Sequence, residues 1–348
     1  MTTNLNQALS IKQQNLRHLI SRRNVVGVGV GYKETSDGLT DELAVLVNVA
    51  QKLPKAQLAE SDLVPKMLDG VKTDVIETGR FLAGQVDPAR VETAAEAERF
   101  NTKNRCRPTV PAGVSISHAD VTAGTFGCLV RRGSELFILS NNHVLANVNS
   151  AKPGDPIIQP GRYDGGRAED QVAVLAEFIP IDFGGKEAES GLARSLEQLL
   201  NFFARIFKSS HRFMSYNTTP GENLVDVALA RPLNPEQLTP EIPQIGRPRG
   251  VAQAGLGTPV QKMGRTTGYT QGRITQIDVT TQVEYNGRLA TFTDQLMASG
   301  MSEGGDSGSV VLDERQNVIG LLFAGSRQAT LINPIQTVLR LLNVEIVT

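Results

Sequence analysis

A serine between glycines is the residue of this chain whose setting best suits covalent chemistry. Ser307 stands in the run Gly-Gly-Asp-Ser-Gly-Ser over residues 304–309, directly before the apolar run 310–312. A serine hydroxyl is a weak nucleophile at neutral pH, so it needs a general base and donors for the oxyanion that it forms. Glycines on both sides allow a sharp turn, so the amides of Gly305 and Ser307 can point at one developing charge. A Gly-Asp-Ser-Gly surface turn is the alternative interpretation of these residues.

A histidine and an aspartate stand upstream in settings that suit the other two catalytic roles. His143 follows the apolar run 137–139 and two asparagines, and Asp226 lies inside the otherwise apolar run Leu-Val-Asp-Val-Ala-Leu. A buried aspartate is costly without a partner, and the N–H of a histidine is a suitable one. The chain order His, Asp, Ser is one of those found among catalytic triads. We therefore predict that His143 is the general base, Asp226 its orienting acid and Ser307 the nucleophile.

On these residues, the region 113–343 resembles a chymotrypsin-fold serine peptidase. The run Gly-Arg-Thr-Thr-Gly-Tyr at 264–269 is similar to the bacterial branch that includes alpha-lytic protease and the streptogrisins. The resemblance implies a mainly β fold with two six-stranded antiparallel β-barrels, the triad in the crevice between them and a C-terminal helix. Two features depart from this pattern: a long segment separates His143 from Asp226, and Ser309 stands where a second glycine is usual.

The resemblance also implies how the oxyanion loop is supported. The carboxylate of Asp306 is expected to be buried behind the loop and to need a cationic partner. Arg265 resembles the arginine that serves this purpose in the bacterial branch, and a guanidinium suits a permanent buried pairing. We therefore expect an Arg265–Asp306 salt bridge, with the oxyanion hole of Gly305 and Ser307 formed without proteolytic activation.

The same comparison locates a specificity pocket. Met301 is expected at its base, and Phe323, Ala324 and Gly325 along its wall strand. None of these residues carries a charge. The resemblance therefore implies cleavage after small or apolar side chains in preference to lysine or arginine.

Short apolar runs alternate with glycine and asparagine turns from Gly113 onward, which predicts an all-β region. One segment differs, because the apolar residues between 188 and 208 recur at helical spacing and predict an inserted amphipathic helix. A final helix is expected to begin at Asn333, an N-cap residue type, with Pro334 at the first helical position.

The first 82 residues differ in pattern, with a helix-like start followed by runs rich in valine and glycine. We expect a small α/β domain over 1–82, a linker over 83–112 and the protease domain over 113–348. The position of this domain resembles that of the pro-region of the bacterial enzymes, so intramolecular inhibition is a hypothesis. Its Gly-Val-Gly-Val-Gly run at 27–31 is better interpreted as a strand packed closely against a neighbour than as a nucleotide loop, because no Gly-Lys-Ser/Thr follows.

The charge balance excludes two classes of partner. The chain has 348 residues, and 35 Lys+Arg against 36 Asp+Glu give a formal net charge of −1. Without a run of like charges, binding to nucleic acid or to a membrane surface is not expected. No signal-like apolar block opens the sequence, so we expect a cytoplasmic protein, with secretion by another route left open.

The two cysteines leave two alternatives open. Cys106 and Cys128 either form a disulfide that closes a loop of about 20 residues or remain two reduced thiols, as a cytoplasmic location favours. They cannot form a metal cluster by themselves, and no His-Glu-x-x-His run accompanies them. We therefore expect neither a metal nor another cofactor.

Together these observations predict a serine endopeptidase that cleaves a peptide or protein substrate through an acyl-enzyme. The alternative is a catalytically silent barrel of the same fold that serves as a binding or scaffolding module. The sequence leaves the oligomeric state open.

Overall fold

The computed structural model describes residues 3–35, 38–84, 100–184, 192, 195–196, 198–201 and 221–348. The linker expected over 83–112 is thus described only at its two ends, and the inserted helix expected over 188–208 lies largely outside the described residues. Among the helices that are described, none is both long and apolar enough to cross a membrane.

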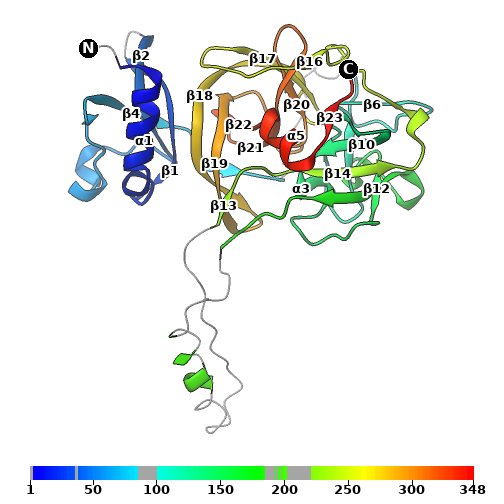
Figure 1. The fold of residues 1–348 in the computed structure, drawn as a ribbon, viewed down its shortest axis with the longest axis horizontal. Coiled ribbons are helices and arrows are strands. Elements are labelled where there is room, and N and C mark those ends of the chain that lie inside the picture. The colour runs from blue at the N-terminus through cyan, green and yellow to red at the C-terminus, as the bar shows by residue number, and fades with distance from the viewer. Residues whose placement is uncertain are drawn as a thin grey trace.

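The first element is a small α/β module with its own core. Helix α1 (Leu5–Ile20) packs on strands β1 (Val25–Thr35), β2 (Gly38–Val49) and β4 (Val71–Glu77), and strand β3 (Met67–Leu68) pairs with β4. Strands β1 and β2 are antiparallel, and β4 pairs with β2 in parallel. The core between helix and strands includes Leu19, Val28 and Val45, all fully buried. Figure 1 shows the module to one side of strand β18.

The module joins the rest of the protein through a continuous sheet. Strand β1 pairs in antiparallel fashion with β18 (Gly268–Tyr285). A Cβ atom added to Gly29 would lie 2.6 Å from Gln276 Oε1, so the glycines at 27–31 let the two strands approach closely. Lys12 of α1 is fully buried, and its Nζ lies 3.1 Å from both Asp278 Oδ2 and Thr280 Oγ1 of β18. The module is therefore packed against the β region.

Two large sheets form the β region (Figure 1). The thirteen-stranded sheet adds to β1–β4 and β18 these strands: β5 (Phe81–Leu82), β13 (Glu222–Asn223), β16 (Gly250–Val251), β17 (Pro259–Gly264), β19 (Arg288–Ser299), β20 (Val310–Leu312), β21 (Asn317–Gly325) and β22 (Ala329–Pro334). The eight-stranded sheet contains β7 (Ser115–His118), β8 (Gly124–Thr125), β9 (Cys128–Arg132), β10 (Glu135–Ser140), β11 (Pro156–Ile158), β12 (Gln171–Phe178), β14 (Ala228–Pro232) and β23 (Glu345–Ile346).

A two-stranded sheet of β6 (Val110–Pro111) and β15 (Leu238–Thr239) completes the strands. The predicted mainly β fold, with an α/β module ahead of it, is confirmed. The strand counts differ from six and six because β1–β4 of the module extend one sheet and short strands such as β8 and β23 extend the other.

Two short helices follow apolar strands. Helix α3 (Asn142–Leu145) begins just after β10, and helix α5 (Ile335–Leu342) begins directly after β22. The final helix therefore begins one residue later than expected, with Pro334 as its N-cap and no side-chain cap. Asn333 does not cap it because its side chain is used elsewhere: it accepts from the amide of Asp226 at 3.0 Å and donates to Gln295 Oε1 at 2.6 Å.

Candidate active site

His143 and Asp226 form a buried pair. His143 lies on α3, which begins just after the end of β10, and Asp226 lies in the loop between β13 and β14. Nδ1 of His143 is 2.6 Å from Oδ2 of Asp226, and the backbone N–H of His143 donates to Oδ1 at 3.3 Å. Asp226 is fully buried. A carboxylate in this position orients the imidazole and leaves Nε2 as the nitrogen that faces a reacting group.

Three further residues fix Asp226. Tyr285, the last residue of β18, donates its hydroxyl to Oδ2 of Asp226 at 2.8 Å. Asn333 accepts from the Asp226 amide, and the side chain of Asn141 donates to the Asp226 carbonyl at 2.7 Å. Burial, followed by the nearby Asp226 carboxylate, raises the pKa of Tyr285 well above its ordinary value. Its hydroxyl therefore remains a protonated donor at neutral pH. Nothing in the sequence connected Tyr285 or Asn333 with Asp226, whereas Asn141 stands two residues before the histidine.

Ser307 lies on a tight loop between the two sheets. Its glycine neighbours Gly305 and Gly308 have φ angles of +98° and +94°, values that an L side chain rarely adopts. The carbonyl of Ser307 accepts from the amide of Thr125 at 2.8 Å. A Cβ atom on Gly308 would lie 2.2 Å from Oγ of Ser140, the last residue of β10. The loop therefore packs against the strand that leads to His143.

The hydrogen bond from Ser307 to His143 that the proposed roles require during catalysis is not formed in this structure. Oγ of Ser307 donates to the carbonyl of Phe323 at 3.3 Å instead. Nε2 of His143 is buried and, among the described residues, has no hydrogen-bond partner. In this rotamer the Phe323 carbonyl competes with His143 for the Ser307 hydroxyl. Catalytic hydrogen bonds are often loose before substrate binds, and a buried ring nitrogen without a partner is a costly feature that a reacting group would satisfy.

The amides expected to form the oxyanion hole are free of internal acceptors. Within the described part of the chain, neither Gly305 nor Ser307 donates its backbone N–H to another residue. Ser307 is only 4% exposed, so its unpaired amide is largely withdrawn from solvent. Two such amides beside one serine can stabilise a negative charge that develops there.

The expected Arg265–Asp306 salt bridge is absent, and Lys262 takes the role instead. Asp306 is fully buried, and Lys262 Nζ lies 3.2 Å from its Oδ2. Oδ1 accepts from the amides of Thr266 and Thr267 at 2.7 and 3.1 Å. Burial alone would raise the pKa of Asp306, but the Lys262 ammonium and the hydrogen bonds from Thr267 and from the Glu303 amide outweigh it, so the pKa lies below its ordinary value.

Strand register explains this correction. Gly264 ends β17, and a Cβ atom there would lie 2.5 Å from Asp306 Oδ1. Residues two apart on a strand share a face, so Lys262 points to the same side as Gly264. Arg265 instead forms a bidentate ion pair with Asp164, with Nε 2.8 Å from Oδ2, and its guanidinium lies 5.1 Å from the ring of Tyr163. A lysine two residues before the Gly-Arg-Thr-Thr-Gly run was the signal that could have identified the partner.

The expected specificity residues lie close together but pack into two clusters. Gly325 pairs with Thr330, and the hydroxyl of Thr330 accepts from the Met301 amide at 3.2 Å. Phe323 and Ala324 belong to the apolar cluster around Tyr285, whereas Met301 belongs to a neighbouring one. All three side chains are buried.

The cysteines are both free, so the disulfide alternative is wrong. Cys128 faces the barrel core, and burial raises the pKa of its thiol to about 12. Cys106 is half-buried, and burial raises the pKa of this thiol also. Among the described residues, no group of three or more His, Cys, Asp or Glu side chains is arranged to hold a metal ion.

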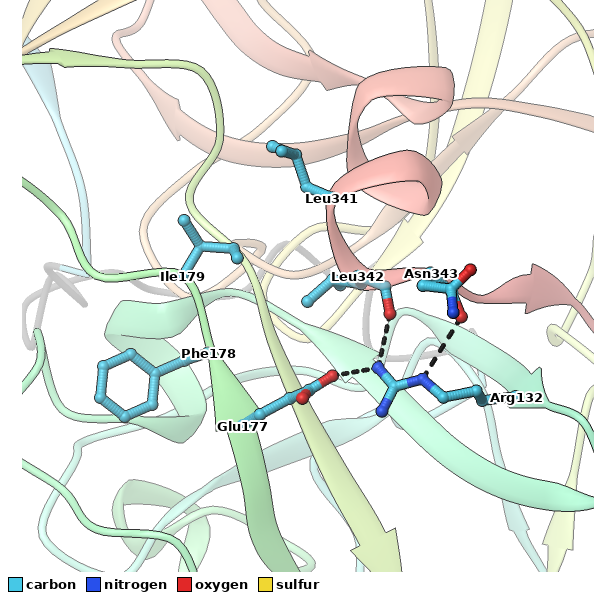
Figure 2. Close-up of a pocket in the computed structure, with 7 residues that line it drawn as sticks. All are labelled: Arg132, Glu177, Phe178, Ile179, Leu341, Leu342 and Asn343. Atoms are coloured by element: carbon cyan, nitrogen blue, oxygen red, sulfur yellow. Dashed lines mark hydrogen bonds and ion pairs between the residues drawn. The ribbon is translucent and has the colours of Figure 1, made fainter.

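A separate pocket of about 320 Å³ lies where the end of α5 meets β9 and β12 (Figure 2). Arg132 reaches across it to Glu177, and its Nε donates to the carbonyl of Asn343 at 3.3 Å. The charges of Arg132 and Glu177 in this pocket thus neutralise each other, and Arg132 caps the C-terminus of α5. None of the candidate catalytic residues lines this pocket.

The solved structures that match this chain include two proteases. Protease A of Thermobifida fusca matches 69% of this chain and 99% of its own, with a TM-score of 0.44 and 19% identity. The chymotrypsin of Cellulomonas bogoriensis matches the same shares, with a TM-score of 0.42 and 16% identity. At such low sequence identities, these matches do not assign the activity of those proteins to this chain.

By sequence, the chain is similar to the rice protein NARROW LEAF 1 (Oryza sativa subsp. japonica). The two are 24% identical over 336 residues, which cover 88% of this chain. The chain spans about half, 52%, of the length of that relative. Residues 1–77 also match the family described as the NARROW LEAF 1 N-terminal domain, which corresponds to the α/β module.

Proposed function

We propose that the protein is a serine endopeptidase that uses Ser307 as nucleophile, His143 as general base and Asp226 as the orienting acid. The observation that carries the proposal is the buried His143–Asp226 contact of 2.6 Å, which leaves Nε2 of the same ring without a partner. A structural histidine would be expected to use both ring nitrogens.

In the proposed mechanism, substrate binding turns the Ser307 hydroxyl from the Phe323 carbonyl to Nε2 of His143. His143 accepts the proton as Oγ attacks the peptide carbonyl, and Asp226 stabilises the imidazolium. The free amides of Gly305 and Ser307 donate to the oxyanion. The imidazolium then protonates the leaving amine, and water releases the acyl group with His143 again as base.

The substrate is proposed to be a peptide or protein with a small or apolar residue before the cleaved bond. Met301, Phe323, Ala324 and Gly325 carry no charge that would bind lysine or arginine.

The test is digestion of a mixed peptide library, with the products identified by mass spectrometry. The purified full chain should cut after small or apolar residues, and Ser307→Ala and His143→Ala should each abolish the products. Since residues that act as a unit fail together, the double variant should be no worse than either single one. Equal cutting by wild type and Ser307→Ala would rule out the proposed nucleophile.

One observation favours the second candidate, a catalytically silent binding module. His143 and Ser307 are only 3% and 4% exposed, so in this conformation little of either side chain is open to a substrate. A folded protein that cleaves nothing, and whose Ser307 reacts with no fluorophosphonate in wild type or in any variant, would support that alternative.

A further inference from the structure

A short strand of the chain itself lies along the wall of the candidate cleft. Strand β5 is inserted between two longer strands: it pairs in parallel with Val283 and Glu284 of β18, and Leu82 pairs in antiparallel fashion with Gly325 of β21. The amide of Ala83 donates to the carbonyl of Glu284 at 3.1 Å. Residues 78–84 are called the cover segment below.

The cover segment ends against the candidate base. A Cβ atom on Gly84 would lie 3.2 Å from Cδ2 and 3.9 Å from Nε2 of His143. Gly84 has a φ of +75°, so a glycine is needed both for its backbone and for its closeness to the imidazole. The chain therefore passes beside the ring nitrogen that has no partner.

Buried side chains hold the cover segment in place. Phe81 and Ala83 are 1% and 3% exposed and belong to the apolar cluster that contains Phe323 and Ala324. Leu82 between them is 38% exposed. The hydroxyl of Ser326, next to Gly325, donates to the carbonyl of Thr78. The segment thus contacts β21 through both its backbone and alternate side chains, which is how an extended peptide is recognised by strand addition.

We propose that the cover segment is an intramolecular inhibitor: it occupies the end of β21 at Gly325, beside His143, and must leave before a substrate can bind there. This inference rests on the proposed peptidase function. It gives the α/β module a role, because β4 leads into the cover segment and the module is fixed to β18 through β1 and Lys12. Regulation would then consist of releasing residues 78–84 from β21.

The test compares two charge substitutions in the full chain. Phe81→Asp places a carboxylate in the buried cluster and should expel the cover segment. Leu82→Asp is the matched control, because it adds the same charge at the adjacent, exposed position. We expect Phe81→Asp to increase the rate at which a fluorophosphonate labels Ser307 by at least about tenfold over wild type, and Leu82→Asp to change it less than about threefold. A synthetic peptide of residues 78–84 should slow the labelling of Phe81→Asp, and the same peptide with aspartate in place of Phe81 should not.

Each outcome is informative. If Ser307 of the wild type is labelled as fast as Ser307 of Phe81→Asp, the inhibitory role is overturned and the proposed peptidase function stands. If Ser307 is labelled in none of the variants, although all of them melt cooperatively, the peptidase function itself is contradicted. If Phe81→Asp does not fold, Gly84→Val replaces it in the test. The valine side chain would meet His143, and the backbone of residue 84 would be strained. Unchanged labelling of Ser307 in a folded Gly84→Val protein would also overturn the proposal.

Discussion

Tyr285 donates a hydrogen bond of 2.8 Å to Oδ2 of Asp226, the same oxygen that contacts the His143 ring. The bond joins a strand of the thirteen-stranded sheet to the acid of the candidate triad. The ring of Tyr285 also lies edge-on to that of His143, with centroids 5.7 Å apart. Tyr285 is therefore a positioning residue for both partners.

Removing this hydroxyl should slow catalysis more than it weakens binding. A hydrogen bond to a charged group contributes about 1.5–3 kcal/mol, so Tyr285→Phe should lower kcat roughly tenfold or more with little change in KM. Steady-state peptide hydrolysis measures both constants. Phe292→Leu is the control, because it disturbs the neighbouring ring without contacting Asp226; a kcat for Tyr285→Phe equal to wild type would refute the positioning role.

The Lys262–Asp306 pair should be energetically coupled. Lys262→Met leaves Asp306 buried without its cation, which should cost about 3–5 kcal/mol in the free energy of unfolding. Adding Asp306→Asn should recover part of that loss, so the two effects should not add. Urea unfolding of the single and double variants gives the coupling. Arg265→Ala, which acts on Asp164, should show little coupling to Asp306→Asn, and strong coupling there would contradict the observed pairing.

Asp306 should also make the protein sensitive to acid. Its folded pKa lies below the ordinary value of 3.8, so the stability that it contributes is present above about pH 4 and is lost as the pH falls through the folded pKa. Unfolding free energies measured between pH 5 and 2 should therefore fall more steeply for wild type than for Asp306→Asn, where the titrating group is absent. Equal slopes would mean that the carboxyl is not preferentially ionised in the folded state.

The thiols should be free and of unequal reactivity. Because burial raises the pKa of Cys128 to about 12, it should not react with a thiol reagent at pH 8 until the protein unfolds, whereas half-buried Cys106 should react slowly. Unfolding without reductant should release two reactive thiols. A count of zero under those conditions would indicate a disulfide.

The sequence predicted those features that depend on local pattern. A histidine after an apolar strand and an aspartate within an apolar run were sufficient to pair His143 with Asp226, because a buried carboxylate needs a donor. The partner of Asp306 was predicted wrongly, because the choice between Lys262 and Arg265 depends on the face each occupies where β17 ends. Tyr285 and β5 could not be found in this way, since their contacts join residues distant in sequence through sheet pairing.

The most direct test of the account is the mass of the intact protein after treatment with a fluorophosphonate, followed by peptide mapping of the adduct. In the Phe81→Asp background, we predict a single adduct on Ser307, and its loss when Ser307→Ala or His143→Ala is added. Wild type measured beside it should give the same adduct more slowly. A folded Phe81→Asp protein that acquires no adduct on Ser307, or that acquires it equally well with His143→Ala, would contradict the proposed triad.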